Sequence, residues 1–240
     1  MGSVPALGKV ARLTGMSRLR SLLVVLSTAL IVTGCSSGSD SKSSTPAGNA
    51  GGLPAATDLL TKSSTAMTGV TSVAFNMTTE GTPPIPIKSI AGDLLKNGDS
   101  QGTLTTDTFG TPIEVKYVLL GEKLYAEFAG SYKTMDKTTI TSVMDPSAIL
   151  DPARGIPLLL TKATGATSEA KENGAVRIGA TLPAAAVQGL GVKTQADIKG
   201  QVWIAEADNR LTKVKMVLPG GSVILTLADY NKNPAIKAPA

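Results

Sequence analysis

The sequence contains no histidine, and this excludes several kinds of reaction centre. Without an imidazole there is no Ser–His–Asp triad and no Cys–His pair, and the commonest protein ligand of zinc and copper is missing. No Walker-type phosphate loop occurs, and Gly189-Leu190-Gly191 lacks the last glycine of a dinucleotide-binding fingerprint. We therefore predict a protein that is not an enzyme and that uses no metal and no cofactor.

Aromatic residues are also scarce, at 3% of the chain, although 42% of the chain is hydrophobic. The interior must therefore be built mainly from Ala, Val, Leu, Ile and Met, whose side chains repack more readily than rigid rings. Such an interior suits a deformable apolar cavity, and it is equally compatible with an ordinary filled aliphatic core.

The single cysteine, Cys35, ends a segment with the three parts of an export signal. Arg18 and Arg20 give the basic start, residues 22–32 the apolar middle, and Val32-Thr33-Gly34-Cys35 has the form of a lipobox. At about 1.5 Å per residue, the apolar run is too short to cross a hydrocarbon core of about 30 Å. We predict that residues 1–34 are a lipoprotein signal peptide and that Cys35 becomes the lipid anchor on the extracytoplasmic face of the plasma membrane.

The net charge of +5 comes mostly from this signal segment. Its four basic residues are matched by no acidic one, and removing them leaves 19 basic against 18 acidic residues. A nucleic-acid-binding protein would keep clustered cations and stacking aromatics, so we predict no nucleic-acid partner. Met16 is an alternative start to Met1, because Ser17-Arg18-Leu19-Arg20 follows it as a normal basic opening.

Residues 35–53 are predicted to be the lipidated cysteine and a flexible tether, because they are small, polar and nearly free of apolar anchors. A tether of this length reaches roughly 20–25 Å, which keeps a folded domain near the membrane. Residues 54–240 are predicted to form one domain. Their last ten residues, rich in Pro and Ala, are expected to be loose.

The hydrophobic period changes five times along this domain. Helical spacing predicts a helix over residues 54–68 that ends at Gly69, and alternation then predicts strands up to residue 136. Residues 140–163 lack alternation, and two or three short helices are expected there. Strands return over residues 166–181, a helix follows over 183–190, and three strands are predicted over 201–230.

Two Asp-Pro steps, Asp145-Pro146 and Asp151-Pro152, lie in the helical middle. Aspartate caps free amides at a helix start, and proline suits the first turn because its missing N–H would be unpaired there. A paired-carboxylate acid–base site is the alternative reading of these two residues. Helix capping already explains why each precedes a proline, so we favour it.

Four motifs, in this order and spacing, resemble those of the mycobacterial LppX/LprA/LprF/LprG lipoprotein family. They are Ile90-Ala91-Gly92-Asp93-Leu94, Gly121-Glu122-Lys123-Leu124-Tyr125-Ala126, Met144-Asp145-Pro146-Ser147-Ala148-Ile149-Leu150-Asp151-Pro152-Ala153-Arg154-Gly155 and Val202-Trp203-Ile204-Ala205. The resemblance covers the lipobox, the tether and residues 54–238. It implies an α+β fold, a strongly curved antiparallel half-barrel with helices packed on its concave face, similar in architecture to the LolA/LolB carriers.

The resemblance also implies an apolar cavity for the acyl chains of envelope lipids or lipoglycans, with the headgroup at its mouth. Strand parity and the helical segment select twelve candidate lining residues, each of which could equally be ordinary core. They are Val73, Phe75, Leu104, Val115, Tyr117, Leu119, Leu124, Phe128, Ile149, Leu150, Leu159 and Leu160.

The leading hypothesis is therefore a lipoprotein that carries or presents acylated lipid between the plasma membrane and the outer envelope. A membrane lipid exporter is a further candidate partner, and the cell wall or a shed form are alternative locations. Two other functions remain open. One is an enzyme that acts on envelope lipids, against which the missing histidine argues. The other is a structural or surface-interaction lipoprotein without a ligand cavity.

Overall fold

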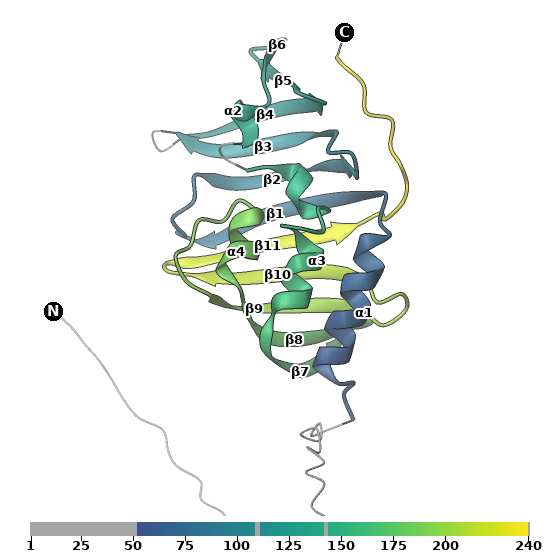
Figure 1. The fold of residues 1–240 in the computed structure, drawn as a ribbon. Coiled ribbons are helices and arrows are strands. Elements are labelled where there is room, and N and C mark those ends of the chain that lie inside the picture. The colour runs from purple at the N-terminus through teal and green to yellow at the C-terminus, as the bar shows by residue number, and fades with distance from the viewer. Residues whose placement is uncertain (1–51, 109–110, 142–143, 240) are drawn as a thin grey trace, which may run out of the picture. The chain divides into compact units, whose positions relative to one another are not determined.

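The computed structural model describes residues 52–108, 111–141 and 144–239, which form one curved antiparallel sheet with helices on one of its faces (Figure 1). The strands are β1 (Ser72–Gly81), β2 (Ile87–Leu95), β3 (Ser100–Thr108), β4 (Thr111–Leu120), β5 (Lys123–Phe128), β6 (Ser131–Asp136), β7 (Thr164–Glu172), β8 (Ala175–Leu182), β9 (Ile198–Ala205), β10 (Leu211–Leu218) and β11 (Gly221–Ala228). The helices are α1 (Ala56–Thr68), α2 (Thr138–Thr141), the 3₁₀ turn η1 (Pro146–Ile149), α3 (Ile156–Lys162) and α4 (Ala184–Gly189).

The first and last strands pair with each other, and this sets the order of the sheet: β6-β5-β4-β3-β2-β1-β11-β10-β9-β8-β7. Strands β1 to β6 form one meander and β7 to β11 a second. The connection from β6 to β7 must then travel from one edge of the sheet to the other. It crosses the concave face and carries α2, η1 and α3 (Figure 1). The predicted fold class is confirmed.

Alternation along the strands separates a buried face from an exposed one. In β8, for example, Val176, Ile178 and Leu182 are fully buried while Arg177 is half-buried on the opposite face. These side chains and those of the crossing helices form one hydrophobic cluster, to which Ile156 and Leu159 also belong. Helix α1 packs on α3, where the Ser64 hydroxyl donates to the Pro157 carbonyl at 3.0 Å. The core therefore lies between the concave face and the helices.

A pair of glycines marks the closest approach of two strands. Gly92 of β2 and Gly102 of β3 are register partners. A Cβ on Gly92 would lie 2.0 Å from the Gln101 carbonyl oxygen, and one on Gly102 would lie 2.0 Å from that of Ala91. No side chain fits at such distances, so the two glycines permit a local geometry that any other residue would prevent.

The C-terminal tail, residues 231–240, is not loose at its start. Two asparagines there, Asn231 (φ 62°) and Asn233 (φ 45°), have left-handed backbone conformations. The Asn231 side-chain oxygen accepts a hydrogen bond from the Thr71 amide at 2.9 Å. The Asn233 amide donates to the Ser72 hydroxyl at 2.8 Å. Asparagine tolerates this conformation and supplies side-chain hydrogen bonds, which composition alone did not reveal.

Asp145 and Asp151 have different local roles. Asp145 caps η1 as predicted, since its carboxylate accepts from the Ser147 amide at 3.1 Å. Asp151 does not begin a helix, because its carboxylate accepts from the Ala153 amide at 2.8 Å in a turn that precedes α3. Helix α3 instead starts after Gly155, with a proline in its first turn.

The predicted signal peptide, Cys35 and nearly all of the tether lie outside the described residues, so the domain division stays a prediction. None of the helices within the described ranges is long and apolar enough to cross a membrane.

Candidate functional site

Nine of the twelve predicted lining residues come together in the hydrophobic cluster between sheet and helices. Each of them is at most 4% exposed. They are Val73, Phe75, Tyr117, Leu119, Leu124, Ile149, Leu150, Leu159 and Leu160. Their burial suits a lining and a filled core alike, so their role in ligand binding remains a prediction.

The other three predicted residues lie on the same face but are less covered. Leu104 and Val115 are register partners and are half-buried, and Phe128 is 42% exposed. Ile113, two residues along β4 from Val115, is 45% exposed on this face. We refer to Leu104, Ile113, Val115 and Phe128 as the open strip. Because Leu104 also packs against the hydrophobic cluster, the strip is continuous with the core.

Ile113 is not among the twelve predicted lining residues, although it continues the same alternation as Val115 and Tyr117. The signal was present in the sequence. Alternation places Ile113 on this face, and the structure leaves its side chain open to solvent near the start of β4.

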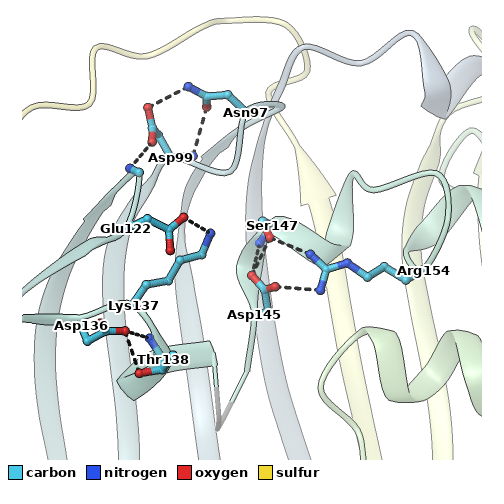
Figure 2. Close-up of polar contacts among 10 residues, drawn as sticks. Asn97, Asp99, Glu122, Asp136, Lys137, Thr138, Asp145, Ser147 and Arg154 are labelled. Carbon is cyan, nitrogen blue, oxygen red and sulfur yellow. Dashed lines mark hydrogen bonds and ion pairs between the residues drawn. The ribbon is translucent and has the colours of Figure 1, made fainter.

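Polar contacts fasten the first part of the crossing connection to the sheet (Figure 2). The Asp136 carboxylate accepts from the Thr138 amide at 2.9 Å and from its hydroxyl at 2.7 Å, and the amide bond in particular lowers the pKa of Asp136. Lys137 lies 3.6 Å from the carboxylate of Glu122, in the turn between β4 and β5. Helix α2 is thus fixed at its start to an adjacent strand turn.

Arg154 joins residues within the second part of the crossing connection, around η1. Its guanidinium lies 2.9 Å from Asp145 and 2.7 Å from Asp151, and it donates to the Ser147 hydroxyl at 3.1 Å. Figure 2 shows it reaching Asp145 and Ser147 at the start of η1. The hydrogen bond from Arg154 is the main reason that the pKa of Asp151 lies below its ordinary value. Capping and ion pairing therefore account for both carboxylates.

We expect Arg154→Met to lower the free energy of unfolding by about 1 kcal/mol at pH 7, because a half-exposed arginine that joins two carboxylates is worth more than a single surface pair. The pKa of Asp151 is lower in the folded protein than in the unfolded chain, where it is about 3.9. Its charged form therefore stabilises the fold at pH values above about 3.9. This stabilisation is lost as the pH falls through the pKa of the folded state. The difference between wild type and variant should therefore shrink below pH 4 in urea titrations.

Lys232→Met is the matched control, because Lys232 and Asp229 form an exposed pair three residues apart. It should change the free energy of unfolding at neither pH. A deficit in Arg154→Met that is equal at pH 7 and pH 3 would attribute the effect to lost packing instead of charge.

The family model of the LppX_LprAFG lipoproteins matches residues 55–236. The chain belongs to this family. It is 31% identical over 233 residues to the lipoarabinomannan carrier protein LprG of Mycolicibacterium smegmatis, covering 92% of this chain and 96% of the relative. It is 30% identical over 235 residues to LprG of Mycobacterium leprae, covering 92% and 95%.

Two crystal structures of family proteins show the same fold. LprF from Mycobacterium bovis superposes with a TM-score of 0.67 at 21% identity, covering 77% of this chain and 97% of LprF. LppX from Mycobacterium tuberculosis superposes with a TM-score of 0.58 at 20% identity, covering 75% and 97%. Membership makes this chain an envelope-associated lipoprotein. Its attachment through Cys35 stays a prediction.

Trp203, which lies in one of the family-like motifs, has a structural role on the convex face. Its indole N–H donates to the Glu172 carboxylate at 2.8 Å, and the Lys213 ammonium lies 3.7 Å from the ring centroid. Lys213 is the register partner of Trp203 on β10. The ring therefore packs away from the hydrophobic cluster.

Proposed function

We propose that this lipoprotein binds the acyl chains of an envelope lipid or lipoglycan between its concave face and helices. Anchored through Cys35 on the extracytoplasmic face of the plasma membrane, it carries or presents this lipid towards the outer envelope. The observation that carries the proposal is similarity along 92% of the chain to proteins named as lipoarabinomannan carriers. The apolar concave face, open to solvent at one end, supports it.

An acyl chain cannot cross water between two membranes without a large free-energy cost. Exposing a methylene group to water costs about 0.8 kcal/mol of free energy. Exposing an acyl chain of about sixteen carbons therefore costs roughly 12 kcal/mol. A carrier removes this barrier only if it covers the chain along most of its length. The aliphatic cluster is a large apolar region within the described residues, and its side chains would have to repack around the acyl chain.

The open strip is the proposed entrance. Ile113 and Phe128 present apolar surface to solvent, and half-buried Leu104 joins them to the cluster. The segments that cover this half of the sheet, α2 and η1, have only four residues each. Few backbone hydrogen bonds hold such short elements, so a modest free energy displaces them and opens room for an acyl chain.

The test is to purify the full chain from membranes, extract it with organic solvent, and identify the released lipid by mass spectrometry. The lipid on Cys35 is covalent and stays with the protein, so released lipid reports the cargo. We expect close to one acylated lipid or lipoglycan per protein. A chain that folds normally and releases none would instead be a structural lipoprotein with a filled core.

A further inference from the structure

Within the described residues, two neighbouring hydroxyl groups on the concave face are buried with no hydrogen-bond partner other than each other. Tyr117 of β4 is 2% exposed and Ser100 of β3 is fully buried. Among the described residues, neither the phenol oxygen nor the Ser100 oxygen has a hydrogen-bond partner outside this pair. They are close neighbours, because Ser100 pairs with Leu119 and Tyr117 with Gly102, which places both side chains on one face of adjacent strands.

Three other buried or partly buried hydroxyls among the described residues have hydrogen-bond partners. Ser72 accepts from the Asn233 amide at 2.8 Å, Ser222 donates to Glu80 at 2.9 Å, and the Tyr230 hydroxyl donates to the Leu211 carbonyl. A third unpartnered hydroxyl, that of Ser63, stands alone on α1. Leaving a polar group unpaired inside a protein is unfavourable, so two adjacent hydroxyls buried in the hydrophobic core require an explanation.

The chemistry of the pair is that of a hydrogen-bond donor. Burial raises the pKa of Tyr117 far above its ordinary value, and a side-chain hydrogen bond with neighbouring Ser100 lowers it by less. The phenol therefore keeps its proton at every physiological pH. A bond between two hydroxyls uses only one of their two O–H donors, so one donor of the pair stays unpaired. Gly102, directly opposite on β3, brings no side chain of its own to the phenol.

We propose that Tyr117 and Ser100 form an internal polar contact for the ester carbonyl of a bound acyl chain. This inference rests on the proposed function and identifies the group that the site recognises. An ester carbonyl accepts hydrogen bonds and has no proton to donate, so it matches two hydroxyl donors. The surrounding Leu119 and Leu124 suit the methylenes next to it. An alkyl ether lacks this carbonyl and leaves the hydroxyls unsatisfied, which a buried polar site disfavours.

The test is a competition between two lipids that differ only at this group. The full chain is exchanged into detergent that contains equimolar diacyl and dialkyl phosphatidylcholine of equal chain length, and the lipid it retains is extracted and counted by mass spectrometry. We expect wild type to retain the ester form in about fivefold excess, the ratio given by one net hydrogen bond of about 1 kcal/mol. Tyr117→Phe should bring the ratio close to one.

Tyr230→Phe is the matched control, since it removes a phenol whose hydrogen bond lies within the protein. It should lower stability and keep the fivefold ratio. Equal retention of both lipids by wild type, or an unchanged ratio in Tyr117→Phe, would overturn the inference and leave the proposed function standing. An internal water shared by the two hydroxyls would give that result. Retention of neither lipid by wild type would overturn both.

Discussion

Replacing Gly102 with alanine should strongly destabilise the protein. The new Cβ would lie 2.0 Å from the Ala91 carbonyl oxygen and 2.8 Å from the Gly92 Cα, both of them backbone atoms that cannot move aside by changing rotamer. Relief requires that β2 and β3 separate in the middle of their pairing. We expect a loss of about 3 kcal/mol or more, a large part of the 5–15 kcal/mol that typically stabilises a domain.

Equilibrium unfolding in urea, followed by circular dichroism, measures this loss. Gly69→Ala is the control, because that glycine ends α1 at φ −82° and its Cβ would meet nothing closer than 3.6 Å. It should be neutral or slightly stabilising. A Gly102→Ala protein as stable as wild type would show that the sheet is not tightly closed at this pair.

Local patterns in the sequence predict most elements of this fold, but not the order of its strands. Alternation finds the strands, and the prolines of the middle segment indicate short helices. The pairing of β1 with β11 joins residues about 150 positions apart, and no local pattern encodes it. That pairing nevertheless decides that the β6–β7 connection must cross the concave face, and so decides which part of the face becomes the core.

Parity alone could not distinguish covered from uncovered positions on one face. Leu124 and Phe128 have the same parity on β5, yet Leu124 is 3% exposed and Phe128 is 42% exposed. The difference depends on how far the crossing helices extend over the sheet. Parity likewise places Tyr117 inside, but that its hydroxyl lacks a partner is a property of the packed neighbours, which the sequence does not display.

Replacing Leu104 with tryptophan should abolish most lipid binding without unfolding the protein. Leu104 lies between its concave-face partners Ile90 and Val115, at the junction of the open strip and the hydrophobic cluster. An indole ring there would block the open strip, which is the proposed entrance for an acyl chain. Because Leu104 is only half-buried, the larger side chain can tilt towards solvent, and we expect a stability change within about 1 kcal/mol.

Lipid released per protein, measured by mass spectrometry, should fall at least tenfold in Leu104→Trp. Thr103→Trp provides the matched control, because Thr103 pairs with Ala91 and Lys116 on the convex face of the same strand. It adds the same ring one residue away and should retain the cargo. If Leu104→Trp holds as much lipid as wild type while remaining folded, then acyl chains do not enter through the open strip. If both variants lose lipid equally, the loss comes from a general disturbance of β3 and not from a block on its concave face.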